Sequence, residues 1–263
     1  MLHGTLSGAA SLTDETVRNF HKQGYLVVRR LFSQSDIQDA LQEAGELFQR
    51  RDLIVSENIR CRWQPHVTTQ ECLFECFDPV IDIGPVCDRL AHDPRLLQVL
   101  SDLYGEEPCL FKDKLIFKPP GAKGYDLHQD FIAWPDFPRS FVTAVVALDA
   151  TDLENGCTVV YPDYHRDGCM SPEDGDYHAL PREAVDESRA VPLILAPGDV
   201  ALFGCFTPHC SAPNRSERWR RQLYLSYNAL SDGGERRAEH YREFHVWLRK
   251  KYAEYGKPFV YFK

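Results

Sequence analysis

Two residues that could bind a transition metal, His128 and Asp130, stand in one short stretch after a Lys-Pro-Pro-Gly turn. We predict this stretch to be a strand, on which alternate side chains share a face. His128 and Asp130 would then point the same way and Gln129 the opposite way. An imidazole and a carboxylate on one face are two metal ligands, and His209 is the best candidate for the third. Two histidines and one carboxylate leave the opposite side of a metal open, which is the arrangement of non-haem Fe(II) oxygenases.

A second block, from His209 to Arg220, gives the main support for an iron site. A His-x-Asp pair is expected by chance in a chain with ten histidines, and His128 alone could be a structural histidine at the end of a strand. Here, however, Ser211 and Arg220 follow His209 in the order that a 2-oxoglutarate site would use. A guanidinium matches a carboxylate in a two-pronged geometry. Arg220, helped by Ser211, could therefore hold the far carboxylate of a dicarboxylic cosubstrate.

With these residues the chain resembles the phytanoyl-CoA dioxygenase family of Fe(II)/2-oxoglutarate-dependent oxygenases. The resemblance spans nearly the whole chain, as a series of short blocks in the family's order. These blocks are Leu12-Thr13-Asp14, Gly24 to Val28, Lys118 to Gly121, His128-Gln129-Asp130, Asn155-Gly156-Cys157, Pro197-Gly198-Asp199 and Tyr224 to Asn228. They are a poor guide to the substrate, because such families share a scaffold and vary the pocket.

The resemblance implies a dioxygenase that hydroxylates a small molecule. Fe(II) would be held by the two histidines and the aspartate named above, with 2-oxoglutarate and O2 as cosubstrates and succinate and CO2 as co-products. The spacing from His209 selects Arg220 over its neighbours Arg218 and Arg221 as the partner of the cosubstrate carboxylate, because that spacing matches the family.

Further candidates surround this set. Three residues are candidates for contact with the cosubstrate, namely Gln129, Thr143 and Lys114. Lys114 stands where the family places a residue beside 2-oxoglutarate, and an exposed strand lysine is the alternative. Three others are candidates for the substrate pocket, namely Trp134, Arg62 and Trp63. A core tryptophan and an irregular surface segment over residues 52–80 are the alternatives for these three.

Bulk composition limits the class of protein. The formal net charge of −9 argues against nucleic acid as a partner, because phosphate binding needs clustered Lys and Arg. The nine cysteines contain no Cys-x-x-Cys pair, and we expect reduced thiols in a cytoplasmic protein. We find no apolar run long enough to span a membrane and no targeting segment. The oligomeric state is left open.

The pattern of the chain predicts helices in front and strands in the centre. Helices are expected at 14–23 after a Thr13 cap, at 36–51 after Ser33 or Ser35, at 85–103 with a break at Pro94, and at 235–254. Strands are expected at 25–28, 112–118, 140–148, 157–161, 191–195, 200–203 and 220–228, with an acidic loop at 166–190. We therefore predict one α+β domain over residues 1–263. Its core would be a double-stranded β-helix (a jelly roll of the cupin type), flanked by N-terminal and C-terminal helices.

Two other classes of function fit parts of this pattern. A zinc hydrolase would also use two histidines and a carboxylate, with a metal-activated water, but would not need Arg220. A non-catalytic jelly-roll binding protein would not need the metal ligands at all.

Overall fold

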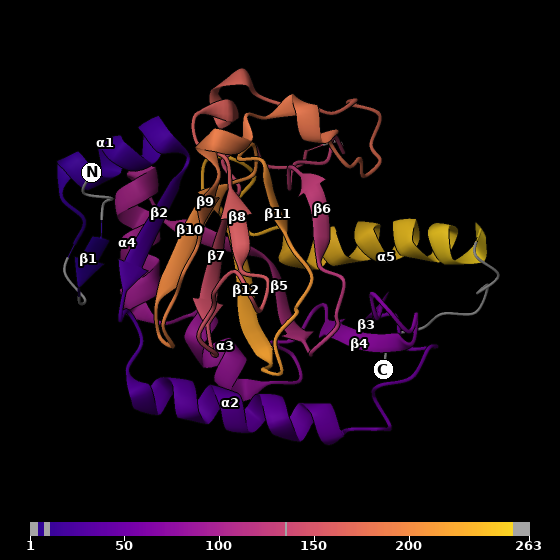
Figure 1. Cartoon of the computed structure of the whole chain (residues 1–263). Coiled ribbons are helices and arrows are strands. Elements are labelled where there is room, and N and C mark those ends of the chain that lie inside the picture. The colour runs from indigo at the N-terminus through magenta and orange to yellow at the C-terminus, as the bar shows by residue number, and fades with distance from the viewer. Residues whose placement is uncertain (1–4, 8–10, 135, 255–263) are drawn as a thin grey trace.

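The computed structural model of the chain describes residues 5–7, 11–134 and 136–254. Its centre is formed by two sheets (Figure 1). The larger has the strand order β1 (Thr5–Ser7), β2 (Tyr25–Arg29), β10 (Val200–Gly204), β7 (Val142–Ala147), β12 (Arg220–Ala229), β5 (Pro108–Lys118), β4 (Cys72–Phe77) and β3 (Cys61–Pro65). The smaller has the order β6 (Tyr125–His128), β11 (His209–Ser211), β8 (Thr158–Val160) and β9 (Val191–Pro192). Among these described strands every pairing is antiparallel except β1 with β2.

Five α-helices flank the sheets, namely α1 (Asp14–Gln23), α2 (Gln34–Gln49), α3 (Pro85–Ala91), α4 (Pro94–Tyr104) and α5 (Arg237–Glu254). Their ends follow local rules. The Thr13 hydroxyl accepts a hydrogen bond from the Thr16 amide at the start of α1, and Gly24 ends that helix with φ of 82°. Ser33 and Asp36 form a reciprocal capping box at the start of α2. The segment between β8 and β9 holds three short 3-10 helices, Tyr164–Asp167, Arg182–Ala184 and Glu187–Arg189.

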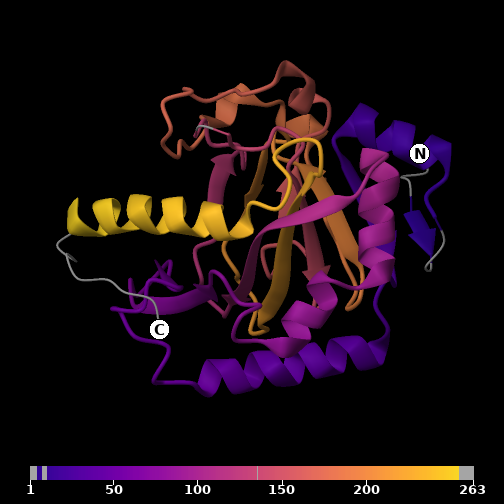
Figure 2. The ribbon, with the colours of Figure 1, turned by 180° about the vertical axis from the view of Figure 1, so that it is seen from behind.

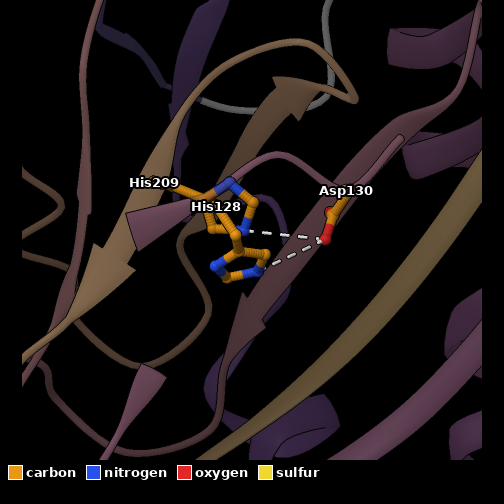
Figure 3. Close-up of side chains that lie close together, drawn as sticks. All are labelled: His128, Asp130 and His209. Carbon is orange, nitrogen blue, oxygen red and sulfur yellow. Dashed lines mark ion pairs between the residues drawn. The ribbon is translucent and has the colours of Figure 1, made fainter. Parts of the chain in front are cut away.

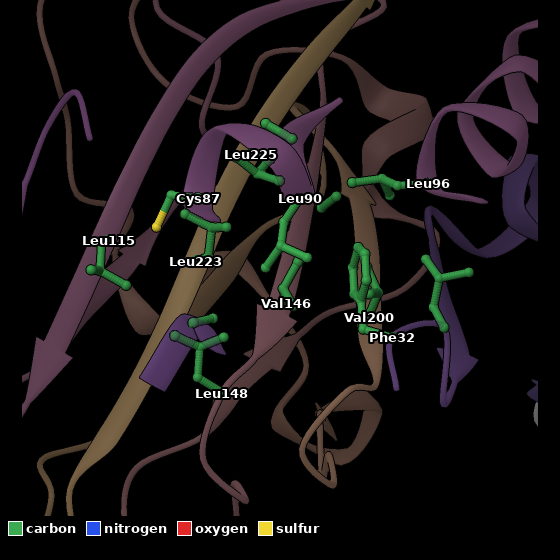
Figure 4. Packing of buried hydrophobic residues seen from close by; sticks show 14 of the residues in the cluster. Phe32, Cys87, Leu90, Leu96, Leu115, Val146, Leu148, Val200, Leu223 and Leu225 are labelled. Carbon is green, nitrogen blue, oxygen red and sulfur yellow. The ribbon is translucent and has the colours of Figure 1, made fainter. Parts of the chain in front are cut away.

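One hydrophobic core lies between the larger sheet and the helices behind it (Figure 2). Leu223 and Leu225 of β12 and Val146 of β7 point to this side, where they meet Leu90 of α3 and Leu96 of α4 (Figure 4). All five side chains are fully buried. Burial of a leucine or valine contributes about 1.5–3 kcal/mol, so this layer is a main source of the sheet's stability.

The opposite face of the larger sheet turns toward the smaller sheet. Alternation along β7 puts Val145 and Ala147 on this inner face, where they pack with Val160 and Leu193 from the smaller-sheet side. Alternation along β5 likewise puts polar residues on the inner face. Lys112, Lys114 and Lys118 alternate with Asp113, Leu115 and Phe117, of which the last two belong to the helix-side core. The interior between the sheets therefore carries charge.

Helix α5 runs alongside the sheets on the side away from α1 and α4 (Figures 1 and 2). Two residues of its first turns attach it to β5. Arg237 donates to the fully buried Asp113 carboxylate at 2.7 Å, and the Tyr241 hydroxyl donates to the Asp113 carbonyl at 2.7 Å. The same hydroxyl lies 3.1 Å from Asp78. These buried contacts hold α5 beside the inner face of β5.

Two expectations from the sequence were wrong in detail. Residues 52–80 are not an irregular surface segment throughout, because β3 and β4 within them extend the larger sheet, with Cys76 opposite Ile116. The strand expected to carry both metal ligands ends at His128, so Asp130 lies just beyond it. Within the described residues, no helix is both long and apolar enough to cross a membrane.

Candidate metal and cosubstrate site

The three predicted metal ligands come together in the structure (Figure 3). His128 Nε2 lies 3.8 Å from Asp130 Oδ1, and His209 Nε2 lies 3.6 Å from the same oxygen. All three ligand atoms lie within 4.8 Å of one another. Two imidazole nitrogens and one carboxylate oxygen, converging on one point and partly buried, fit the ligand set of a non-haem Fe(II) site.

The backbone orients both histidine rings for metal binding. His128 Nδ1 lies 2.7 Å from the carbonyl of Asp126, and His209 Nδ1 lies 3.0 Å from the carbonyl of Thr207. A carbonyl can only accept, so each Nδ1 carries the hydrogen and each Nε2 presents its lone pair. Such contacts to the outer nitrogen fix the tautomer and the orientation of a metal-binding histidine.

A hydroxyl orients the carboxylate. Thr143, on the inner face of β7, donates to Asp130 Oδ2 at 2.9 Å and lies 3.1 Å from the Ser226 hydroxyl of β12. This bond occupies Oδ2 and leaves Oδ1 facing the histidines. We had expected Thr143 to contact the cosubstrate, whereas its observed partner is Asp130, so we assign it a positioning role toward the carboxylate.

The protonation states suit a cation. Burial, followed by the neighbouring His209, lowers the pKa of His128 to about 3. Burial alone would raise the pKa of Asp130, but His209, Lys114 and His128 outweigh it and lower that pKa to about 2. At neutral pH the imidazole of His128 is thus unprotonated and the carboxylate is ionised, as metal ligation requires.

Arg220 is the most unusual buried charge in the protein. It is 0% exposed, and none of its three guanidinium nitrogens has a hydrogen-bond partner among the described residues. It faces Lys118 across the β12–β5 ladder. Burial and the charge of Arg220 lower the pKa of Lys118 to about 6. A buried cation without a partner is costly, so the geometry calls for an anion from outside the protein.

The Ser211 hydroxyl can donate a hydrogen bond close to Lys118, the residue opposite Arg220. Its oxygen accepts from Lys118 Nζ at 3.1 Å and from the Tyr125 amide at 3.2 Å. Both contacts use the lone pairs of the hydroxyl, so its own hydrogen remains available. Arg220 and Ser211 together supply the donors that a carboxylate needs.

The two rival arginines are already engaged. Arg218 is half exposed and pairs with Asp152 at 2.6 Å and with Glu154 at 3.3 Å. Arg221 pairs with Asp149 at 2.8 Å. Neither has a guanidinium left for a buried carboxylate, which agrees with the choice of Arg220.

Gln129 does not fit the cosubstrate role in which we had placed it. Its amide nitrogen donates to the carbonyls of Gly168 and Phe206, at 2.9 and 2.7 Å, and its oxygen accepts from the Met170 amide at 2.7 Å. Through these three bonds both polar atoms of the side chain are engaged. They connect Gln129 to the segment after β8 and to the residues just before β11. The polar atoms of Gln129 therefore have a structural role, although its side chain also lines the cavity beside the metal-binding residues.

An inner chamber beside the metal ligands is lined by polar side chains from both sheets. Lys114 and Tyr224 line it together with Tyr125, Thr158 and Ser211. The Lys114 ammonium lies 5.1 Å from the centre of the Tyr224 ring and 6.0 Å from that of Tyr125. Burial alone would lower the pKa of Lys114, but Asp130 and Asp78 outweigh it and raise it. Lys114 is thus a cation beside the candidate metal ligands, and its contact with the cosubstrate stays a prediction.

A larger cavity of about 310 Å³ adjoins the ligands on the side of α5. Its lining includes Trp134, Lys112, Tyr177, His240, Phe244 and Trp247. A further, outer cavity of about 610 Å³ is lined by Arg62 and Trp63 and shares Lys114, Tyr125, Tyr177, Phe244 and Trp247 with its neighbours. The three residues expected to form a substrate pocket therefore lie in adjoining hollows. The Trp134 indole also donates to the Gly175 carbonyl at 2.7 Å.

Sequence reasoning missed the contribution of α5; it expected the 166–190 loop to cover the site but named no residue in it. Helix α5 supplies His240, Phe244 and Trp247, and the segment supplies Tyr177, whose ring lies 5.5 Å from that of His128. The sequence of α5 combines aromatic and charged residues. A helix that only covers the surface does not need so many aromatic side chains, so this composition could have pointed to α5. Nothing in the sequence around Tyr177 marks that residue.

Comparisons with known proteins identify the family of the chain. The family model for phytanoyl-CoA dioxygenase matches residues 20–222. The chain is 38% identical over 152 residues to methylphosphonate hydroxylase of Gimesia maris, and 35% identical over 146 residues to 2-aminoethylphosphonate dioxygenase of an uncultured bacterium. These alignments cover 58% and 55% of this chain, and the chain spans 55% of the length of each relative.

A solved structure of EctD from S. alaskensis with 2-oxoglutarate and 5-hydroxyectoine is also similar. It superposes with a TM-score of 0.67 at 25% identity, over 84% of this chain and 77% of that one. The chain therefore belongs to the phytanoyl-CoA dioxygenase family, as the resemblance predicted. Proteins described as dependent on alpha-ketoglutarate, or solved with iron or 2-oxoglutarate bound, are among those to which the chain is similar.

Proposed function

We propose that this protein hydroxylates a small molecule in an Fe(II)- and 2-oxoglutarate-dependent reaction, with succinate and CO2 as co-products. His128, Asp130 and His209 would hold the iron, and Arg220 with Ser211 would hold the far carboxylate of 2-oxoglutarate. The observation that carries the proposal is the buried, unpartnered guanidinium of Arg220, which shares the interior between the sheets with the three metal-binding atoms.

The topology supports the same reading. Strands β5, β7, β10 and β12 belong to the larger sheet, and β6, β8, β9 and β11 to the smaller one. This distribution supports the double-stranded β-helix expected from the sequence, which we propose as the architecture of the core. Pairing of β6 with β11 brings together ligands that are distant in the chain.

When bound, iron with 2-oxoglutarate and O2 supplies the oxidising power that removes a hydrogen from the substrate and returns a hydroxyl group. The residues of this chain bind, orient and shield. Thr143 keeps one oxygen of Asp130 turned toward the histidines. The rings of Phe203 and Tyr177 lie beside His209 and His128 respectively, with ring centres 4.5 and 5.5 Å apart.

The zinc hydrolase and the non-catalytic binding protein explain less. A hydrolase needs a metal-bound water and no second anion site. That function therefore does not explain the buried cation at Arg220. A binding protein gains nothing from two histidines held in the metal-binding tautomer. Both alternatives give distinct results in one assay.

The test is succinate formation by the purified protein supplied with Fe(II), 2-oxoglutarate and O2. The panel of substrates would begin with methylphosphonate and 2-aminoethylphosphonate, for which two relatives are named. We expect succinate formation that requires Fe(II) and is stimulated by at least one member of the panel.

The same assay applies to the variant Arg220→Ala. The Arg218→Ala variant is its matched control, because it removes a nearby surface arginine. Metal binding without any binding or consumption of 2-oxoglutarate would overturn the proposal in favour of a hydrolase.

A further inference from the structure

The 310 Å³ cavity contains two polar groups that the reaction above does not use. One is His240 of α5 and the other is Lys112 of β5. They come from facing elements that are held together through Asp113 and Tyr241. Both belong to the lining of the space next to Asp130.

His240 is buried without satisfying its polar atoms. It is 4% exposed, and neither ring nitrogen has a hydrogen-bond partner among the described residues. Its ring stacks on Phe244 at 5.5 Å with an interplanar angle of 11°, and lies 4.3 Å from Phe111. Burial, followed by the charge of Lys112, lowers the pKa of His240 to about 3. A neutral imidazole among aromatic rings thus keeps one N–H free to donate and one nitrogen free to accept.

Lys112 is a mostly buried ammonium group whose close carboxylate is shared with a second cation. Burial lowers the pKa of Lys112, and a bound anion would favour its charged form. Its ammonium lies 3.3 Å from Asp78 Oδ2 and 4.0 Å from the centre of the Phe244 ring. Arg62 also pairs with Asp78, at 3.8 Å. One carboxylate therefore faces two cations. Glu75 lines only the outer cavity, and burial raises its pKa, which favours its neutral form.

The register of the larger sheet places Lys112 at a short distance from the metal ligands. Lys112 lies opposite Ser226 of β12, which lies opposite Thr143 of β7. Thr143 is the residue that binds Asp130. Neighbouring strands are about 4.8 Å apart, so the backbones of Lys112 and Thr143 are roughly 10 Å, two strand spacings, apart, and both side chains line the cavity between them. A molecule of a few bonds in length can bridge that space.

We propose that Lys112 and His240 form an anchoring subsite for an oxyanion group of the substrate, namely a phosphonate, carboxylate or sulfonate. The inference rests on the proposed function, because it names the substrate class of that same site. Lys112 supplies the charge, His240 supplies a directed N–H, and the rings of Trp134, Phe244 and Trp247 cover the short carbon chain. The group that is hydroxylated then lies near Asp130, where the metal would be held.

The test is equilibrium binding by titration calorimetry under argon, with Fe(II) and 2-oxoglutarate present. The probes are ethylphosphonate, propionate and ethanesulfonate, with propionamide as the neutral counterpart. We expect at least one oxyanion to bind and propionamide not to bind. The affinity should fall about tenfold or more in Lys112→Met, which removes a charge-assisted hydrogen bond, and Lys112→Arg should restore part of it. Which oxyanion binds most tightly identifies the head group.

His240→Phe separates a ligand role from a structural one. It keeps an aromatic ring and removes two unsatisfied nitrogens, so the protein should be at least as stable to heat while the oxyanion binds several-fold more weakly. Lys123→Met is the matched control for charge, because Lys123 is exposed and pairs only weakly with Asp126 at 3.5 Å. It should bind the probes as the unmodified protein does.

Three results would overturn the subsite. These are no measurable binding of any oxyanion, unchanged binding in both Lys112→Met and His240→Phe, or an equal loss in Lys123→Met. Fe(II)-dependent succinate formation with the substrate panel distinguishes the two proposals. If a panel member stimulates it in the unmodified protein while the oxyanion data fail, only the subsite is wrong. If no panel member stimulates it while binding depends on Lys112, the subsite stands and the proposed reaction is wrong.

Discussion

His128 of β6 and His209 of β11 are directly opposed partners in an antiparallel ladder, with ring centres 4.2 Å apart. The backbone of two neighbouring strands therefore sets the separation of the two imidazoles. Asp130, in contrast, reaches the same point from beyond the end of β6 and depends on Thr143 for its orientation. The histidines are fixed by the sheet, while the carboxylate is fixed by a side chain.

Removing any one of the three ligands should abolish iron-dependent turnover and leave the fold intact. We expect this of His128→Ala, Asp130→Ala and His209→Ala, because the strands that carry the histidines are paired through their backbones. Iron content and succinate formation would be measured together with the thermal unfolding midpoint. His92→Ala, an exposed histidine, is the control. Full activity in one of the three variants would remove that residue from the ligand set.

Arg220→Ala should raise the concentration of 2-oxoglutarate needed for half-maximal turnover by about 100-fold or more. Loss of one partner of a buried, hydrogen-bonded charge pair costs roughly 2–5 kcal/mol. Arg218→Ala and Arg221→Ala should change it little, since both arginines pair with carboxylates elsewhere. Calorimetric binding of 2-oxoglutarate is the measurement. If Arg218→Ala were the damaging change, the assignment of Arg220 would be wrong.

Arg220→Met should also stabilise the protein in the absence of 2-oxoglutarate. The guanidinium is fully buried without a hydrogen-bond partner in the described structure, and an apolar side chain of similar length avoids that cost. Urea unfolding of the two proteins, with and without the cosubstrate, would measure the difference. The cosubstrate should stabilise only the unmodified protein. A variant that is less stable under both conditions would contradict a role for Arg220 in binding an external anion.

Thr143→Val should weaken iron binding by about 10–100-fold, the usual effect of losing a group that orients a metal ligand. Valine keeps the shape of the threonine but cannot donate to Asp130 Oδ2. Thr143→Ser keeps the hydroxyl and should bind iron nearly as the unmodified protein does. Anaerobic titration with Fe(II) separates the two variants. Equal affinities would show that Asp130 holds its position without this bond.

Lys118 should make stability depend on pH. Its pKa in the folded protein is about 6, below its ordinary value of 10.5. Between these values the unfolded chain binds a proton that the folded chain does not, so stability rises with pH, by at most about 1.4 kcal/mol per pH unit. The Lys118→Met variant lacks this titrating group. The amount by which its unfolding free energy exceeds that of the unmodified protein should therefore be largest near pH 6 and decrease as the pH rises toward 9.

Urea unfolding of both proteins at several pH values checks this dependence. The part of the difference in unfolding free energy that does not vary with pH reflects the hydrogen bonds that Lys118 makes to Gly156, Ser211 and Ala212. The change of that difference with pH reports the titration of Lys118. A difference that does not vary with pH would mean that these three acceptors keep Lys118 protonated in the folded protein.

Those parts of the fold that follow local rules could be predicted from the sequence. Thr13 and Gly24 mark the two ends of α1 through a side-chain cap and a left-handed backbone, and Pro94 separates α3 from α4. The three proposed metal ligands and Arg220 could be singled out because their types and order match a chemical requirement, and the structure brings the three ligands together. The family comparison then confirmed the resemblance.

The rest depends on contacts between distant segments. Gln129 could not be assigned from its neighbours, since its three partners belong to residues 168–206. Strands β3 and β4 form where β4 pairs with β5, and their own sequence has no clear alternation. His240 and Phe244 face the cavity only because α5 is held on β5 through Asp113.

Helix α5 lies outside residues 20–222, the part of the chain that the family model matches. The metal ligands, Arg220 and Ser211 all lie inside that part, whereas one wall of the adjoining cavity does not. Under the proposed function, the residues of the reaction lie in the part shared with the family, while part of the substrate cavity lies beyond it. Variation in α5 could then alter which molecule is bound and leave the proposed metal and cosubstrate residues unchanged. An exchange of α5 between relatives would test how far this helix sets selectivity.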